Sequence, residues 1–231
     1  YTKHFYDVLP AFKDHRYITV DGAPLFLIWK PLDFPNTAAF IQLWSNLAKE
    51  NGLPGIHFVG LQQNIENENI PLHKILTRDI PSQGSILYKE ILDNGYSAVH
   101  GRGYNRAEFL SRPLYEIVFR GICNRLFNHH IISKCDQRDI NKHLYTEEDK
   151  WENVYPMLFP QWDRTPRSGK KARIYTHSTP EVFGEQIDQV LKLVENKQFE
   201  HKIVFLTSWN EWAEGNYVEP DLKFGRRFLD V

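Results

Sequence analysis

Pro24-Leu-Phe-Leu-Ile-Trp29 is a short apolar run that predicts a buried strand, and Gly55-Ile-His-Phe-Val-Gly-Leu61 predicts a second one. Between them, Ala38 to Asn51 places apolar residues at a spacing of three and four, which is typical of a helix with one buried face. Asn51-Gly52 supplies the residues that commonly end a helix. A strand, a helix and a strand in this order, with near-continuous apolar strands, favour a parallel sheet covered by helices.

The same alternation continues along the chain. A polar segment rich in Asn and Glu follows Leu61, and we expect it to be a loop. Thr179 and Pro180 supply an N-cap and a first helical residue. The further predicted strands are 96–99, 154–159, 202–206 and a possible one at 172–176; the predicted helices are 86–92, 108–127 with a break or start at Pro113, and the helix after Thr179.

About five strands in one domain, 1–231, fit two architectures. One is a (β/α)8 TIM-type barrel, of which this chain holds the C-terminal part, because a complete barrel needs about 250 residues. The other is an open doubly wound sheet. The chain begins at Tyr1 and its only methionine is Met157, so we expect the opening strands of the barrel to be missing. No glycine-rich phosphate-binding turn follows any predicted strand, so nucleotide binding has no support.

Composition gives few hints of a partner. The formal net charge is −1, which offers no electrostatic reason to expect a nucleic acid or a membrane surface. No apolar run approaches the length of a membrane span, and no signal peptide is visible. Cys123 and Cys135 lack metal-ligand spacing, so we expect reduced thiols in a cytoplasmic protein and no metal site at these residues, although one disulfide stays open. The aromatic content of 14% fits either a large aromatic core or rings that stack on sugars.

The segment after the last predicted strand carries the most chemistry. Trp209-Asn210-Glu211-Trp212-Ala213-Glu214 places two carboxylates three residues apart, between tryptophans. In a helical turn the two carboxylates lie on one face, and two carboxyl groups in different environments can act as acid and base on a glycosidic bond. The alternative is a pair of exposed glutamates on a turn. Asn210 is placed to hold a sugar hydroxyl or to orient Glu211.

A second candidate segment is Gln161-Trp-Asp-Arg-Thr-Pro-Arg167, which follows the strand 154–159. One interpretation is a sugar clamp in which Trp162 stacks on the ring, Asp163 accepts two hydroxyls and Arg167 meets a hydroxyl or an anionic group. The other is a structural ion pair of Asp163 with Arg164 or Arg167. Both candidate segments follow strands, where parallel α/β folds place their reactive groups.

Three segments together resemble one known family: Phe12-Lys-Asp-His-Arg-Tyr-Ile-Thr-Val-Asp-Gly-Ala-Pro-Leu-Phe26, Trp162-Asp-Arg-Thr-Pro-Arg167 and Ser208-Trp-Asn-Glu-Trp-Ala-Glu-Gly-Asn-Tyr-Val-Glu-Pro-Asp221. They resemble the WbsX-type proteins of bacterial polysaccharide and lipopolysaccharide O-antigen loci, which are often described as glycosyltransferases. They are also similar to glycoside hydrolase family 99, the endo-α-mannosidases and endo-α-mannanases, which are (β/α)8 barrels. The resemblance covers nearly the whole chain and is weakest from Gln62 to Lys150.

The resemblance implies an oligo- or polysaccharide substrate and the roles of Glu211 as base and Glu214 as acid, without metal or cofactor. In the hydrolases the base is thought to deprotonate the 2-hydroxyl of the sugar and give an anhydro-sugar intermediate. Those enzymes have His where this chain has Ala213, which implies a different subsite. Three functions stay open: a family 99-like glycoside hydrolase, a glycosyltransferase of O-antigen or lipopolysaccharide assembly, and a non-catalytic glycan-binding domain. A barrel that lacks its opening strands also allows a homo-oligomer.

Overall fold

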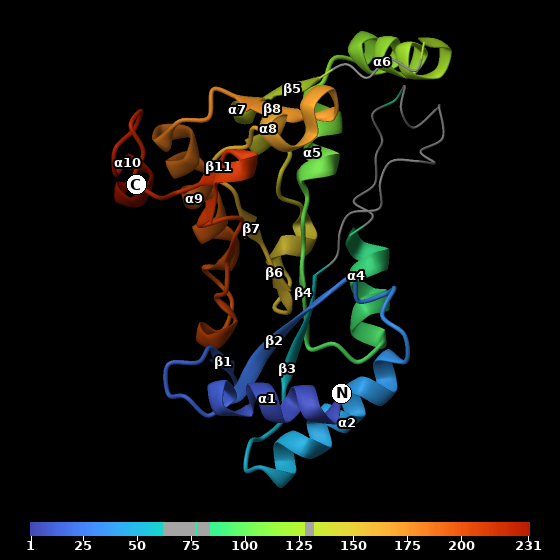
Figure 1. Cartoon of the computed structure of the whole chain (residues 1–231), viewed down its shortest axis with the longest axis vertical. Coiled ribbons are helices and arrows are strands. Elements are labelled where there is room, and N and C mark those ends of the chain that lie inside the picture. Colours follow the sequence, from blue (N-terminus) through green and yellow to red (C-terminus); the bar gives the residue numbers. More distant parts are fainter. Residues whose placement is uncertain (62–76, 78–83, 128–131) are drawn as a thin grey trace.

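The structure is a computed structural model that describes residues 1–61, 77, 84–127 and 132–231 (Figure 1). Its main sheet runs in the order β1-β2-β3-β4-β6, formed by Thr19–Val20, Ala23–Trp29, His57–Leu61, Ala98–His100 and Val154–Tyr155. β2, β3, β4 and β6 are parallel, and β1 joins β2 as an antiparallel hairpin. β7 (Met157–Leu158) continues from β6 after Pro156 and pairs in parallel with β9 (Phe205–Leu206).

The strands of the main sheet lie side by side in chain order, with the strand 133–136 left out, and helical segments stand between the parallel ones along the chain. A doubly wound sheet reverses its strand order at a switch point, whereas a barrel winds in one direction. The described strands therefore form a mixed α/β fold with a curled, half-barrel sheet, and the order of these strands has no reversal of the kind that a doubly wound sheet contains. β5 (Ser133–Asp136) and β8 (Arg173–Thr176) make a separate parallel pair, and β10 (Asn210–Glu211) and β11 (Asn216–Tyr217) make an antiparallel one.

The helices confirm most of the sequence-based predictions. α2 (Thr37–Glu50), α4 (Gly84–Asp93) and α9 (Pro180–Val194) lie where apolar spacing predicts them, and Thr179 caps α9 by accepting from the Val182 amide. The helix predicted at 108–127 is split by Pro113 into α5 (Tyr104–Ser111) and α6 (Leu114–Phe127). The remaining helices are α1 (Thr2–Phe12), α7 (Gln137–Asn141), α8 (Thr165–Ser168) and α10 (Arg227–Asp230), with 3₁₀ turns η1 (Glu147–Lys150), η2 (Gly169–Lys171), η3 (Phe199–His201) and η4 (Trp212–Glu214).

Several elements differ from the predictions. α1 and β5 have no counterpart among the predicted elements. The single strand predicted at 154–159 is divided at Pro156, which has no amide hydrogen for the ladder. The polar segment predicted as a loop after Leu61 falls mostly outside the described residues.

The half of the molecule built from α1, α2 and the first strands has an aromatic core. Trp44 of α2 contacts Phe5 and Phe12 of α1 at ring-centroid distances of 5.5 and 6.2 Å, and Phe26 of β2 at 4.7 Å. Phe58 of β3 lies against the same cluster. Edge-to-face and tilted contacts of this kind are favourable beyond the area they bury. Much of the high aromatic content therefore serves packing.

A buried tyrosine hydroxyl in the main sheet contacts two imidazole rings. The Tyr155 hydroxyl of β6 lies 2.9 Å from Nε2 of His57 and 3.1 Å from Nδ1 of His201. Burial lowers the pKa of His57 to about 4, so this imidazole stays neutral near pH 7. The hydroxyl can donate to one imidazole and accept from the other, which satisfies a polar group that has no exposed surface.

Candidate functional site

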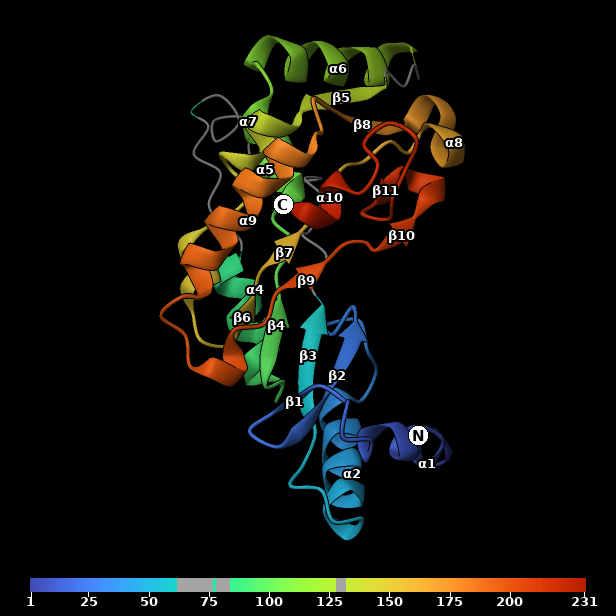
Figure 2. The same ribbon diagram turned by 90° about the vertical axis from the view of Figure 1, so that its left-hand side faces the viewer.

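The candidate site lies at the carboxyl ends of β7 and β9 (Figure 2). Because these two strands are parallel neighbours, the segments that follow them, 161–167 and 207–217, leave the sheet at the same edge. The second segment turns back as the hairpin β10–β11, in which Glu211 is opposite Asn216 and η4 forms the connection. The Asp163 amide donates to the Glu214 carbonyl at 2.9 Å and ties the two segments together.

One guanidinium group bridges the two predicted carboxylates. Arg167 donates to Oε1 of Glu214 at 2.9 Å and to Oε1 of Glu211 at 3.2 Å. Arg164 forms a further ion pair with Oε1 of Glu214 at 3.3 Å. The Glu214 side chain is 14% exposed and that of Glu211 39% exposed, so the pair consists of an enclosed carboxylate and an accessible one. The Glu211 and Glu214 side chains therefore lie on the same side of the turn, as expected. Arg167 contacts both of them there, and Arg164 contacts Glu214.

Trp162 has a different place from the one expected of a sugar-stacking ring. It is only 8% exposed, and its ring meets Tyr104 and Tyr175 edge to face at centroid distances of 5.2 and 5.5 Å. The interpretation of Trp162 as a stacking platform does not fit this geometry, because too little of the ring is open to a ligand. Its indole N–H instead donates to Oε2 of Glu214 at 3.0 Å. Trp162 thus holds the enclosed carboxylate from within the protein.

The exposed tryptophans lie on the hairpin. Trp212 is 48% exposed and stacks on Tyr217 with ring centroids 3.7 Å apart and an angle of 16° between the planes. Its indole N–H donates to Oε2 of Glu219 at 2.7 Å, and the Tyr217 hydroxyl donates to Asp221 at 3.0 Å. Tyr217 therefore covers one face of the Trp212 indole and supports it, while about half of the Trp212 surface stays exposed. Trp209 adds a second exposed ring at the start of the hairpin.

Asp163 and Asn210 play local parts in this structure. Oδ1 of Asp163 accepts from the amide and hydroxyl of Thr165 at 2.9 and 2.6 Å, which starts the short helix α8. The ion pair expected between Asp163 and Arg164 or Arg167 is replaced by the pairs of both arginines with the glutamates. Asn210 is exposed beside Glu211.

Residues that sequence reasoning missed shape the loop. Asn216 is buried; its side-chain oxygen accepts from the Ser208 amide at 2.9 Å, and Ser208 Oγ donates to its carbonyl at 2.8 Å. Gly215 has a φ of +54°, and a Cβ there would lie 3.1 Å from Cβ of Asp163. Only glycine combines this backbone angle with so close an approach. Gly215 and Asn216 both lie in the segment Ser208–Asp221, but the spacing of residues along the sequence does not predict their contacts.

Two further features are absent from the residues that the structure describes. In that part of the chain, no group of three or more His, Cys, Asp and Glu residues is placed to hold a metal ion. None of the helices described is both long and apolar enough to cross a bilayer.

Comparison with known proteins agrees with the motifs. The family described as Glycosyltransferase WbsX matches residues 1–231. Two curated relatives, both called "Uncharacterized protein WxcX" and found in two strains of Xanthomonas campestris pv. campestris, are 26% identical over 220 residues. That alignment covers 95% of this chain, but the chain spans only 28% of the length of these relatives. No solved structure matches the chain. Because the family match extends over the full sequence, the chain belongs to the WbsX glycosyltransferase family.

Proposed function

We propose that this chain carries the acid/base carboxylate pair of an enzyme that acts on glycosidic bonds of a bacterial polysaccharide. The observation that carries the proposal is the bridged pair Glu211 and Glu214 at the carboxyl edge of parallel strands, beside exposed aromatic rings. Carboxylate pairs of this kind cleave and form glycosidic bonds. The family description supports glycosyl transfer, and the similarity of the motifs to glycoside hydrolase family 99 supports hydrolysis on a complete (β/α)8 barrel.

The geometry suggests how the work divides between the two carboxylates. Glu211 is the accessible group, with one oxygen on Arg167, and suits a base that takes a proton from an incoming or neighbouring hydroxyl. The similarity of the motif to family 99 assigns the acid to Glu214. Its Oε2 accepts the Trp162 indole N–H, so the proton for the leaving oxygen belongs on Oε1. Arg167 and Arg164 therefore have to leave Oε1 when a sugar binds.

The exposed Trp212 ring, which is stacked on Tyr217, provides the binding part of the proposal. Sugars present flat C–H faces that pack on aromatic rings and hydroxyl rims that bond carboxylates and amides. The hairpin offers two exposed rings, those of Trp209 and Trp212. Polar groups are available on the same segment from Asn210, Glu211 and Glu219. Arg167 can meet a hydroxyl or an anionic group of the glycan once it leaves the glutamates.

A glycan screen tests the proposal. Wild-type protein, Glu211→Gln and Glu214→Gln are incubated with α-mannans and O-antigen polysaccharides, alone and with acceptor sugars, and the products are read by mass spectrometry. We expect each variant to lose turnover by about 100-fold or more, because acid/base groups typically contribute that much. Shortened glycans would indicate hydrolysis, and extended acceptors would indicate transfer.

Glu147→Gln is a matched control, because Glu147 is also an ion-paired glutamate, bonded to Lys150 on the distant turn η1. Its turnover should equal that of wild type. Retention of activity within a few-fold by both site variants would refute the catalytic assignment. Glycan binding by folded wild type without any product would favour a carbohydrate-binding domain.

A further inference from the structure

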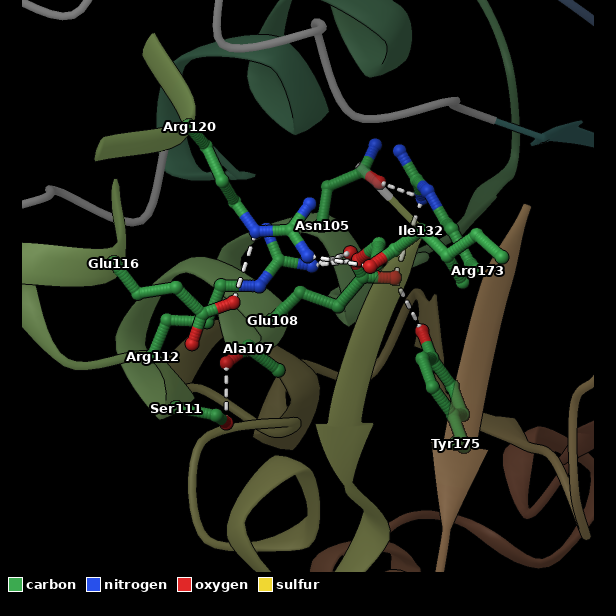
Figure 3. Close-up of polar contacts among 11 residues, drawn as sticks. Asn105, Ala107, Glu108, Ser111, Arg112, Glu116, Arg120, Ile132, Arg173 and Tyr175 are labelled. Atoms are coloured by element: carbon green, nitrogen blue, oxygen red, sulfur yellow. Dashed lines mark hydrogen bonds and ion pairs between the residues drawn. The ribbon is translucent and has the colours of Figure 1, made fainter. Parts of the chain in front are cut away.

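A buried carboxylate lies behind the candidate site and has no part in the chemistry described so far. Glu108 of α5 is 5% exposed at its side chain (Figure 3). Its Oε1 accepts the Tyr175 hydroxyl at 2.6 Å and faces Nη1 of Arg173 at 3.4 Å, while Oε2 accepts from Arg112 at 3.2 Å. Burying a carboxylate is costly unless its oxygens are paired and bonded, and here both are. The arrangement is therefore a specific one.

Tyr175 connects this carboxylate to Trp162. Burial and the neighbouring Glu108 carboxylate raise the pKa of Tyr175 well above its ordinary value, so the hydroxyl keeps its proton and donates it. The ring of Tyr175 then stands at 90° to that of Trp162. A hydroxyl bonded to a fixed carboxylate cannot shift without losing that bond. Glu108 therefore fixes the position of the Tyr175 ring, which packs on one side of Trp162.

Arg173 fixes the other side through Tyr104. Its guanidinium group donates to Oδ1 of Asn105 at 2.6 Å and lies 5.7 Å from the ring centroid of Tyr104. The ring of Tyr104 meets Trp162 at an interplanar angle of 80°. Trp162 thus lies between two edge-on rings, and each of them is held by a contact to Glu108 or to its partner Arg173.

The backbone follows the same route. The Tyr175 amide donates to the Trp162 carbonyl at 2.7 Å, and the Arg164 amide donates to the Arg173 carbonyl at 3.0 Å. β8 therefore pairs with the segment that contains Trp162. That segment holds Glu214 twice, by the Asp163 amide on its carbonyl at 2.9 Å and by the Trp162 indole on Oε2 at 3.0 Å.

We propose that Glu108 is a positioning residue for the candidate site, acting through Tyr175 and Trp162 on the orientation of Glu214. The catalytic half of this inference rests on the proposed function, in which Glu214 is the acid. A displacement of about 1 Å in a reacting group is enough to reduce turnover strongly. Glu108 fixes Tyr175, Tyr175 fixes Trp162, and Trp162 holds the Glu214 carboxylate. Through these contacts Glu108 controls where the Glu214 carboxylate lies.

The first test needs no enzymatic activity. The chain has six tryptophans, so its indole N–H groups give a small set of signals in a ¹H–¹⁵N spectrum, and Trp162→Phe identifies the signal of Trp162. Tyr175→Phe removes the hydroxyl bond to Glu108 but keeps the ring. We expect it, and Glu108→Gln, to move the Trp162 indole signal while the other indole signals stay in place.

Tyr155→Phe is the matched control. It also removes a buried tyrosine hydroxyl from a hydrogen-bonded position, between His57 and His201, in the main sheet. Both tyrosine variants should lose stability in a denaturant titration, because each loses one buried and hydrogen-bonded hydroxyl group. Only Tyr175→Phe should move the Trp162 signal.

The second test uses turnover of the glycan found for wild type. Tyr175→Phe is expected to reduce kcat about tenfold with KM changed less than twofold, because an outer partner orients a reacting group without binding substrate. Tyr155→Phe should leave both constants unchanged. An unmoved Trp162 signal in Tyr175→Phe and Glu108→Gln would overturn the inference, as would an equal loss of kcat in the two tyrosine variants. A wild type without turnover would count against the proposed function only, and the indole signal would still decide the positioning role.

Discussion

Tryptophans in the two halves of the molecule differ in what their indole N–H groups meet. Trp44 in the aromatic core is fully buried among phenylalanines, and its Nε1 has no hydrogen-bond partner among the described residues. Trp162 and Trp212, at the candidate site, each donate Nε1 to a glutamate, at 3.0 and 2.7 Å. The first tryptophan therefore acts through its ring alone, and the other two also orient carboxylates.

This difference explains why aromatic content alone is ambiguous. A core tryptophan stabilises the fold by excluding water from its surface and by ring contacts, even with an unpaired N–H. A site tryptophan contributes direction, because an N–H bonded to a carboxylate fixes where that carboxylate points. The same residue type has both uses, and only the partner of the N–H distinguishes them.

The largest expected effect contrasts Trp44 with Trp212. Trp44→Ala removes a fully enclosed ring and should destabilise the protein by about 3–5 kcal/mol, as large-to-small core changes do. Trp212→Ala removes a half-exposed ring and should change the free energy of unfolding by about 0.5 kcal/mol or less. Urea titration followed by circular dichroism measures both.

Glycan affinity is expected to show the reverse order. Trp212→Ala should weaken binding because the flat surface on Tyr217 is lost, and Trp44→Ala, measured where it is still folded, should bind as wild type does. If Trp212→Ala destabilised the chain as much as Trp44→Ala, the division of the molecule into a structural half and a site half would be wrong.

A smaller effect is expected at Gly215, where the site segments approach most closely. Gly215→Ala should cost about 1–2 kcal/mol for the left-handed backbone angle, plus a further cost for the Cβ contact with Asp163. Gly225→Ala is the matched control, because Gly225 has a φ of +58° and nothing within 4 Å of the added Cβ. The difference in unfolding free energy between the two variants isolates the contact. Equal costs would mean that the hairpin can shift away from Asp163 at no expense.

Local rules predicted the elements that depend on local chemistry. The apolar spacing of α2, the Thr179 cap of α9 and the break at Pro113 need only a few neighbouring residues. The sequence also predicted that Glu211 and Glu214 share a face, because their spacing in a turn determines it.

Contacts between residues far apart in the sequence could not be predicted from the sequence. Whether Trp162 is open or enclosed depends on Tyr104 and Tyr175, which no spacing rule brings together. Arg167 bonds to two glutamates and not to Asp163, which is closer to it in the sequence. This choice depends on the pairing of β7 with β9. Strand order likewise required the structure, because apolar runs predict strands but not their neighbours.

The smallest stability effect is expected at Arg167. Arg167→Lys keeps the positive charge, but an ammonium group cannot reproduce the two-armed bridge to Glu211 and Glu214. The Arg167 side chain is half exposed, so its ion pairs contribute little to folding, and the free energy of unfolding should change by about 0.5 kcal/mol or less. Turnover of the glycan should nevertheless fall, because an ammonium group cannot meet a hydroxyl or an anionic group of the glycan with two arms once it leaves the glutamates.

Arg138→Lys is the matched control for this change, since Arg138 of α7 is a similarly exposed arginine whose two-armed contacts go to Asp136 and not to the two glutamates. It should have the same small effect on unfolding and none on turnover. A large stability loss in Arg167→Lys would show that the bridge serves the fold, and the carboxylate pair would then belong with the aromatic core as structure. A turnover loss without a stability loss would show that Arg167 is part of the site together with the two glutamates. The shape of its guanidinium group would then serve the reaction and not folding.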